Sequence, residues 1–414
     1  MSLLFKTDLK SKVKKLVVFV FIIDVLFWLQ INNFLGFSGS TIVSSTLAYI
    51  SIFIVLKISH SYFNKYNSSS SILFFYRLWI FICVIGVIRG VFLSDNYWDV
   101  KYVFVSGIPL IFVSLLSQVG NKLILFKYIL DYYLDYIVLI ALLFIPLTFI
   151  ANQELFSRLV IAITIFIVFI PYLKKKKVLI IILVTAISIA LVIAFRTNIL
   201  KVTFSILILG CYYYRNIVGK RIITIAFLAL FLSPIFFLSS AISGDFNILN
   251  DIGEKEGYII DGKNGKSENL VADTRTLLYR ELITSVVSSD DILFGSGASG
   301  KYSTIRFENT GGGINGFRYR CEVHFLNIFL YFGFVGVISY TLLLFFVCYQ
   351  GIYNSKNILA KMLSLLIASR FLLSFIEEFT QYDMNFFFFW LIIGLVSSRQ
   401  FRSMSDQQVK SFFK

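Results

Sequence analysis

The chain has 414 residues, of which 58% are hydrophobic and 15% are charged. Soluble domains average about 45–50% apolar and about 25% charged residues, so this composition excludes an ordinary soluble globular protein. The mean hydropathy of +0.82 points the same way, and an aromatic content of 18% suits lipid-facing and interfacial surfaces. The sequence therefore predicts an all-α polytopic integral membrane protein.

Apolar runs divide the chain into about twelve predicted transmembrane helices. A helix of about 20 residues crosses a hydrocarbon core of about 30 Å, and runs near that length recur along most of the sequence. We predict spans at 16–36, 41–58, 72–93, 102–118, 133–151, 155–172, 177–195, 198–215, 221–242, 323–348, 357–376 and 384–399. The predicted parts are 1–242 with the first nine helices, a large hydrophilic loop at 243–322, 323–400 with the last three helices, and a tail at 401–414.

The basic residues predict the orientation, because short cytoplasmic loops collect Lys and Arg. With the N-terminus inside, the short outside loops contain only Lys101, Arg158 and Arg196. The inside segments contain Lys6, Lys10, Lys12, Lys14, Lys15, Lys57, Lys65, Lys122, Lys127, Lys174 to Lys177, Arg215, Lys220, Arg221, Lys356, Lys361, Arg399, Arg402, Lys410 and Lys414. We therefore expect both termini in the cytoplasm and the large loop outside. The net charge of +15 is then an orientation signal, not a nucleic-acid surface.

The large loop is expected to contain a short amphipathic helix. Asp273 is a suitable N-cap for a helix that ends near Ser288. Apolar residues recur along one face of that helix, at Leu278, Leu282 and Val286. This face is expected to pack on the membrane or on the helix bundle.

Two further patterns in and around the loop exclude a dinucleotide site and a disulfide framework. Residues Gly295 to Gly300 match G-x-G-x-x-G, but no βαβ unit surrounds them, so we expect a glycine-rich turn with close backbone approach and no dinucleotide site. Of four cysteines only Cys321 lies near the loop, which excludes a disulfide framework there. The sequence has no cluster with metal-ligand spacing.

Ionisable residues within the spans and arginines at the outer face are candidates for function. Within the spans these are Asp24, Arg77, Arg89, Lys201 and Arg370, of which Arg89 and Arg370 lie deeper, toward the outer half. The alternative is that they pair inside the bundle. Arg196 lies at a tight outer turn, where its planar fork suits phosphate oxygens, although an ordinary phospholipid would also satisfy it. The loop adds Arg275, Arg280, Lys301, Arg306, Arg318 and Arg320.

A carboxylate and an imidazole stand together where the tenth span begins. Glu322 and His324 lie at the outer surface, near the loop arginines. Either group could serve as a general base. The alternative for Glu322 is that it complements the positive end of the helix dipole.

These segments resemble the Wzy-type O-antigen polymerases and the related O-antigen ligases. The resemblance rests on the architecture and on about thirty residues: Arg196-Thr197-Asn198, the loop helix that begins Asp273-Thr274-Arg275 with Tyr279, the segment from Asp291 to Gly297, and the segment from Glu322 to Gly336 that ends in G-x-x-G. In the ligases a His typically stands where Glu322 aligns here. The departure favours a polymerase over a ligase and leaves open whether Glu322 or His324 is the base.

The resemblance implies a glycosyltransferase of lipopolysaccharide or similar surface-polysaccharide biosynthesis in the bacterial inner membrane, with its large loop in the periplasm. It implies metal-independent and cofactor-free transfer from one undecaprenyl-diphosphate-linked oligosaccharide to a second lipid-linked repeat unit. Its partners would include a chain-length regulator and a flippase. The residues that it implies for substrate binding are Arg196 and Arg275, then Arg280, with Arg89, Arg318 and Arg320 as further candidates.

Three other classes compete with a polymerase. A flippase of similar size needs no large outer loop and places its charges in a central cavity. A membrane glycosyltransferase of the more familiar type would have an acidic pair in its first outer loop, and no acid lies between Asn32 and Ser40. A scaffold protein would leave the arginines without a role.

Overall fold

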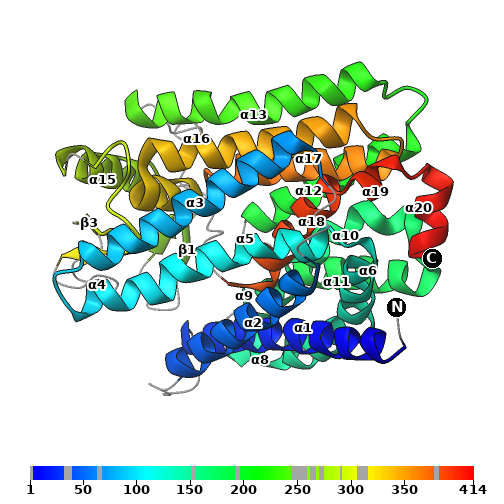
Figure 1. Cartoon of the computed structure of the whole chain (residues 1–414), viewed down its shortest axis with the longest axis horizontal. Coiled ribbons are helices and arrows are strands. Elements are labelled where there is room, and N and C mark those ends of the chain that lie inside the picture. Colours follow the sequence, from blue (N-terminus) through cyan, green and yellow to red (C-terminus); the bar gives the residue numbers. More distant parts are fainter. Residues whose placement is uncertain are drawn as a thin grey trace.

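A computed structural model of the chain is mostly helical, and its long helices lie alongside one another (Figure 1). It describes residues 3–31, 40–62, 68–150, 154–191, 196–243, 259–261, 267–269, 275–289, 291–304, 316–376 and 382–414. The helical segments before the large loop are α1 (Leu3–Ile31), α2 (Ser40–Tyr62), α3 (Ser70–Phe92), α4 (Tyr97–Tyr102), η2 (Val103–Gly107), α5 (Ile108–Gly120), α6 (Leu123–Tyr132), η3 (Tyr133–Ile137), α7 (Val138–Ala141), η4 (Leu142–Phe144), α8 (Ile145–Ile150), α9 (Glu154–Val160), α10 (Ile163–Phe166), η5 (Ile167–Tyr172), α11 (Lys175–Leu191), α12 (Arg196–Tyr213) and α13 (Lys220–Ser243).

The described residues after α13 form two short antiparallel strand pairs and six more helices. The strand pairs are β1 (Ile259–Asp261) with β2 (Ser267–Asn269), and β3 (Tyr302–Ser303) with β4 (Phe317–Arg318). The helices are α15 (Arg275–Ser288), α16 (His324–Tyr353), α17 (Ile358–Leu373), α18 (Met384–Ser397), α19 (Arg399–Ser403) and α20 (Asp406–Phe413). The predicted tail at 401–414 is therefore helical for most of its length, and it packs on the bundle through the buried Val409 and Phe413.

The apolar helices indicate a membrane protein. In the described part of the chain, four stretches are long and apolar enough to cross a membrane: Ser70–Phe92, Tyr97–Gly120, Leu123–Phe149 and His324–Tyr353. Shorter apolar helices include Val43–Ile58, Thr197–Tyr213 and Met384–Ser397. Each predicted span overlaps a described helix or a series of short helical segments. How many of them cross a bilayer stays a prediction.

The outward faces of the bundle are apolar as well. Phe74 and Phe81 on α3, and Ile225 and Phe236 on α13, each expose more than 60% of their surface. Water-soluble proteins rarely expose contiguous large apolar side chains, whereas lipid tails would cover them. The outward faces of α3 and α13 thus fit a lipid environment.

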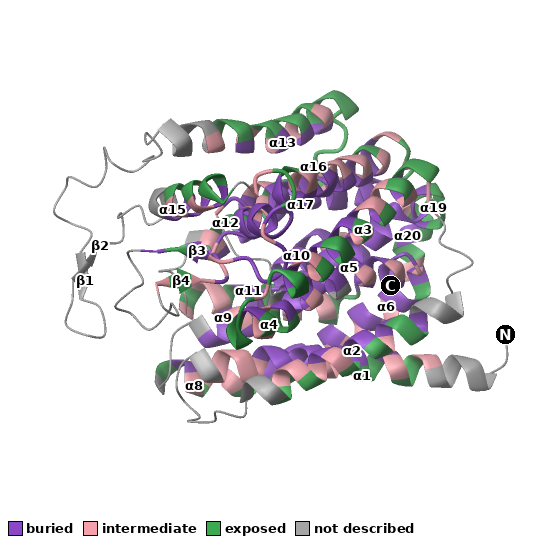
Figure 2. Ribbon diagram, turned by 60° about the vertical axis from the view of Figure 1, so that its left-hand side comes forward, coloured by how far each residue is buried: buried purple, intermediate pink, exposed green. Residues whose placement is uncertain are grey.

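Helix α18 is the centre of the bundle, because every one of its residues is buried. It packs against α5, α16, α17 and α1. Glycines allow the closest of these contacts, since a β-carbon on Gly120 of α5 would collide with the Leu391 carbonyl, and one on Gly394 would collide with the Ser117 carbonyl. Small residues bring helix backbones together in this way inside membranes. Figure 2 shows the buried residues gathered in the interior of the molecule, around α5, α10, α12 and α17.

The two ends of the bundle differ. Figures 1 and 2 show that α1 begins, and α20 ends, at one end of the molecule, whereas α15, β3 and α4 lie at the opposite end. Helix α15 and strand β3, which belong to the predicted large loop, therefore lie at the end opposite the termini. We call the end that carries α15, β3 and α4 the loop end.

The predicted loop helix is present as α15. The three residues that the spacing placed on its apolar face, Leu278, Leu282 and Val286, are all buried. They pack toward α13 and α16, and the Tyr279 hydroxyl donates a hydrogen bond to the Phe375 carbonyl at 2.9 Å. The apolar face therefore meets the bundle, one of the two surfaces expected; the expected N-cap, Asp273, lies outside the described residues.

The glycine-rich motif forms the expected close-packed turn. Gly295 and Gly297 adopt left-handed backbone angles, with φ of 67° and 73°, which glycine reaches without steric cost. A β-carbon on Gly297 would lie 2.5 Å from the Gly90 nitrogen of α3. The turn is tied to α3 and α16 by backbone bonds from Ala298 to Gly86 and from Ser296 to Leu330, both 2.9 Å.

The same contact breaks α16 in two. Gly333 has φ of 59° and ψ of −159°, so the helix is interrupted there. The amides of Phe334 and Val335, which lose helical partners at the break, donate to the carbonyls of Ile292 and Leu293 at 3.0 and 3.1 Å. A β-carbon on Gly333 would collide with the Leu293 carbonyl. We call this interlocked set, Gly90, Gly295, Gly297 and Gly333, the glycine contact.

Replacement of Gly297 by Ala should destabilise the protein by about 2 kcal/mol or more, because it adds left-handed backbone strain of about 1–3 kcal/mol and a backbone collision. The measurement is the midpoint of thermal unfolding in detergent. Gly219→Ala is the matched control, since a β-carbon there meets nothing within 4 Å. Equal midpoints for the two variants would contradict the glycine contact.

Candidate functional site

The predicted site residues whose side chains are described are Arg89, Arg280, Arg318, Arg320, Glu322 and His324, which belong to α3, α15, the β4–α16 connection and the first turn of α16. The strands and α15 lie at the loop end (Figure 2). Arg196 and Arg275 are the first residues of α12 and α15, and their side chains lie outside the described part of the structure.

The segment from Arg318 to Val323 presents its charged residues on one side. Burial alternates along it: Tyr319, Cys321 and Val323 are buried, whereas the charged residues between them are partly exposed. Hydrogen bonds of 2.7 and 2.8 Å join the Asn327 side chain to the Cys321 backbone. The buried residues thus fix the segment and leave Arg318, Arg320 and Glu322 on its partly exposed side.

Arg318 and Glu322 form an ion pair. Their Nη2 and Oε1 atoms lie 3.3 Å apart, and the Glu322 side chain keeps 42% of its surface exposed. Burial alone would lower the pKa of Arg318, but Tyr302 and Glu322 beside it outweigh that effect, so its pKa is raised above the ordinary value. Burial raises the pKa of the Tyr302 hydroxyl. The guanidinium therefore keeps its charge beside the Glu322 carboxylate.

His324 is placed differently from Glu322. The imidazole is fully buried, and its ring lies edge-on to Tyr340 and Phe386 with centroid separations of 5.3 and 5.6 Å. A general base must come within hydrogen-bond reach of the substrate proton. Of the two candidate bases, Glu322 is the one exposed to solvent in this structure.

Arg89 and Arg280 have other surroundings. The Nη2 atom of Arg89 lies 2.5 Å from Asp291, and its Nε donates to the Gly295 carbonyl at 2.9 Å. Arg89 therefore anchors the glycine-rich turn to α3. Arg280 is exposed on α15.

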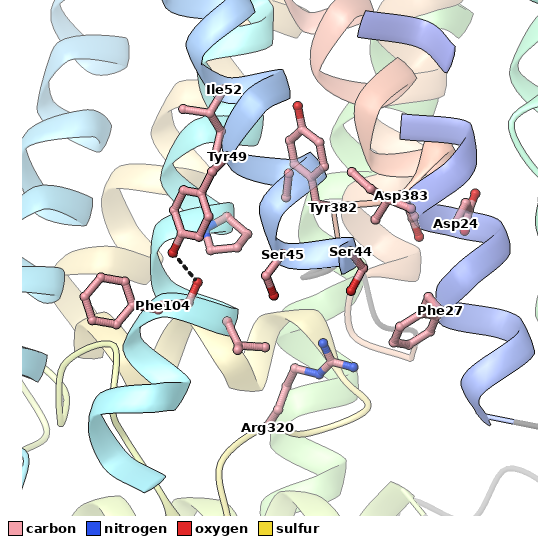
Figure 3. Close-up of a pocket in the computed structure, with 14 residues that line it drawn as sticks. Asp24, Phe27, Ser44, Ser45, Tyr49, Ile52, Phe104, Arg320, Tyr382 and Asp383 are labelled. Atoms are coloured by element: carbon pink, nitrogen blue, oxygen red, sulfur yellow. Dashed lines mark hydrogen bonds between the residues drawn. The ribbon is translucent and has the colours of Figure 1, made fainter. Parts of the chain in front are cut away.

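A pocket opens beside the β4–α16 connection, between α1, α2, η2, α5 and the start of α18 (Figure 3). The centres of water-sized molecules can occupy about 100 Å³ of it, and one water needs only about 10–15 Å³. Its lining residues are Ile23, Asp24, Phe27, Ser44, Ser45, Ala48, Tyr49, Ile52, Phe104, Val105, Pro109, Arg320, Tyr382 and Asp383. Figure 3 shows the Arg320 guanidinium directed into the pocket.

Two carboxylates lie together in this pocket. Asp383 is the N-cap of α18, and its side chain accepts a bond from the Phe386 amide at 2.6 Å. Asp24 accepts a hydrogen bond of 3.3 Å from the amide of Met384, the residue after Asp383. Both acids are thereby fixed at the start of the most buried helix. The pocket brings them into one lining with Arg320.

Sequence reasoning found Arg320 and Asp24 but not the pocket. The strict alternation of polar and apolar residues from Arg318 to Val323 was a usable signal for the exposed charged edge. Asp383 directly before a long apolar run was a usable N-cap signal. Nothing in the sequence indicated that Ser44, Ser45 and Asp383 would meet.

Asp99 connects the charged segment to α4. This aspartate is buried, yet the Lys301 Nζ lies 3.1 Å from both of its oxygens. The Tyr319 hydroxyl donates to it at 2.7 Å, and the Tyr319 ring stacks on Tyr102 at 4.1 Å. Asp99 thus holds the backbone on which Arg318 and Arg320 stand.

Comparisons with known proteins identify no relative of the chain. No protein-family model, no curated protein and no solved structure matches the chain. The functional argument therefore rests on the residues and geometry of this chain.

Replacement of Asp99 by Asn should loosen the segment from Arg318 to Glu322, because hydrogen bonds to a charged group contribute about 1.5–3 kcal/mol. The local readout is faster maleimide labelling of Cys321, which is buried in that segment, with buried Cys348 as the internal reference. Asp95→Asn is the control, since Asp95 is exposed and only its backbone contacts Asp99. Unchanged Cys321 labelling in Asp99→Asn would show that Asp99 does not hold the segment.

Proposed function

We propose that the chain is a membrane glycosyltransferase that polymerises lipid-linked oligosaccharide repeat units, such as those of O-antigen, at the outer face of the bacterial inner membrane. The observation that carries the proposal is the loop-end arrangement in which Arg318, Arg320 and Glu322 stand on one exposed edge beside a polar pocket. The resemblance to Wzy-type polymerases, based on Glu322 to Gly336 and the loop helix, supports the same reaction.

In the proposed reaction, a hydroxyl oxygen of one lipid-linked repeat unit attacks the anomeric carbon of the sugar attached to a second undecaprenyl diphosphate. The bond between that carbon and the diphosphate oxygen breaks, and the leaving diphosphate takes the electron pair. The hydroxyl proton passes to the Glu322 carboxylate. Arg318 and Arg320 stabilise the negative charge of the leaving group, as preorganised donors do.

The proposed orientation places both termini in the cytoplasm, with about twelve spans and the loop end in the periplasm. A chain-length regulator and a flippase would act with the protein, the flippase delivering its lipid-linked substrate. The finding that fits this orientation is that the start of α1 and the end of α20 lie at the end of the bundle opposite α15. The basic residues of the short inside segments support it independently.

The polymerase reaction is tested by incubating purified protein with a lipid-diphosphate-linked repeat unit and resolving the products as a ladder on a gel. Glu322→Gln should lower the rate about 10²–10⁴-fold, as loss of a general base does. Arg320→Ala should lower it about 10²–10³-fold, as loss of a charge-stabilising donor does. Arg399→Ala, exposed beyond the far end of α18, is the control and should keep the wild-type rate.

Other outcomes identify the rivals. Transfer of the glycan only onto added lipid A–core acceptor, without a ladder, would identify a ligase. Movement of the lipid-linked unit across liposomes, without any transfer, would identify a flippase.

The orientation is tested with a membrane-impermeant maleimide on right-side-out spheroplasts. Cysteines introduced as Arg280→Cys on α15 and Lys410→Cys on α20 are both at exposed positions. The reagent should label the first in intact spheroplasts and the second only after the membrane is permeabilised. The reverse pattern would invert the proposed topology.

A further inference from the structure

The pocket beside Arg320 has a lining that the proposed transfer step does not use. On one side lie the carboxylates of Asp24 and Asp383, and near them lie the hydroxyls of Ser44 and Ser45. Figure 3 shows these four groups around the same space. Hydroxyl-bearing ligands donate to carboxylates, and such charge-assisted bonds are about twice as strong as neutral ones.

Aromatic rings complete the lining. Phe27 of α1 and Phe104 of η2 both contribute to it. The Tyr49 hydroxyl donates to the Phe104 carbonyl at 3.0 Å, which fixes α2 against η2 at the pocket wall. Carboxylates and hydroxyls beside aromatic rings suit a molecule that carries many hydroxyls on an apolar carbon frame.

The charges favour a sugar over a diphosphate as the occupant. Arg320 is the one cation among the described residues that line the pocket, and it faces two carboxylates. A diphosphate that entered fully would meet the Asp383 carboxylate at close range, where like charges repel. A neutral or amino sugar would meet hydrogen-bond acceptors instead.

The place of Arg320 relates the pocket to the proposed reaction. It is directed into the pocket (Figure 3), and it belongs to the exposed edge on which Arg318 and Glu322 stand. A diphosphate on that edge would leave the attached sugar next to the pocket opening.

We infer that the pocket is a sugar-binding subsite for the lipid-linked repeat unit, in which Asp24 and Asp383 accept hydrogen bonds from sugar hydroxyls while Arg320 meets the diphosphate at the edge. This inference rests on the proposed function for the identity of the glycan. It adds the class of group that the pocket selects, and it makes Asp24 and Asp383 specificity-determining residues.

The test measures binding, not transfer. The probe is the repeat-unit oligosaccharide freed from its lipid diphosphate by mild acid, titrated into the full-length protein in nanodiscs. Inorganic pyrophosphate is titrated separately and as a competitor. The pocket variants are Asp24→Asn and Ser45→Ala, and Asp383→Asn is a third because Asn also serves as an N-cap. Asp131→Asn is the control, because its carboxylate pairs with Lys177 and neither residue is among those that line the pocket.

The expected result is saturable glycan binding by wild type and by Asp131→Asn, about tenfold weaker binding by Asp24→Asn and Asp383→Asn, and no displacement by pyrophosphate. A tenfold loss corresponds to one charge-assisted hydrogen bond. Thermal unfolding of each variant checks that it is folded, and Ser45→Ala, which removes a single hydroxyl, should weaken binding to a smaller extent.

Absence of glycan binding by the wild type, equal affinity in the folded pocket variants, or displacement by pyrophosphate would each overturn the inference. The polymerase proposal fails independently. A product ladder together with unaltered glycan affinity in the pocket variants would remove the subsite and keep the polymerase. Pocket-dependent glycan binding without a ladder would keep the subsite and remove the polymerase.

Discussion

The loop end depends on the glycine contact, in which two backbone segments approach too closely for any side chain. Gly90 of α3 meets Gly297, and Gly333 of α16 meets the stretch that contains Gly295. The turn packs against the break in α16, where the Phe334 and Val335 amides lose their helical acceptors. These amides donate instead to the carbonyls of Ile292 and Leu293. The Arg89 side chain of α3 donates a hydrogen bond to the Gly295 carbonyl of the same turn. The charged segment from Arg318 to Glu322 lies directly before the first piece of α16, so the contact that positions this piece also positions the segment.

Local features of this fold could be predicted from the sequence because their signals are local. The spacing of Leu278, Leu282 and Val286 predicted both the helix α15 and its buried face. The match to G-x-G-x-x-G predicted the close backbone approach. The break at Gly333 could not be predicted, since it depends on carbonyls about forty residues earlier in the chain. The pocket could not be predicted either, because Asp24, Ser44, Arg320 and Asp383 lie far apart in the sequence.

The structure also shows that arginines with the same predicted role, such as Arg89 and Arg320, have different partners. Arg89 directs its donors to a carboxylate and a carbonyl of the protein itself, whereas Arg320 lines a pocket. The planar guanidinium, whose donors match phosphate oxygens, can equally donate to the carbonyl and carboxylate oxygens of a turn and hold that turn in place. Burial separates the two candidate bases in a similar way. Glu322 lies at the surface beside a cation, and His324 lies among aromatic rings.

The break in α16 has a consequence for where the chemistry would occur relative to the lipid. The helix contains 30 residues, which at about 1.5 Å each would measure about 45 Å, longer than a hydrocarbon core of about 30 Å. The piece after Gly333 has about 20 residues and matches that thickness. In the proposed orientation, the piece before the break then stands above the hydrocarbon. Glu322, just before that piece, would then lie at or above the headgroup layer, on the side of the membrane where the proposed reaction takes place.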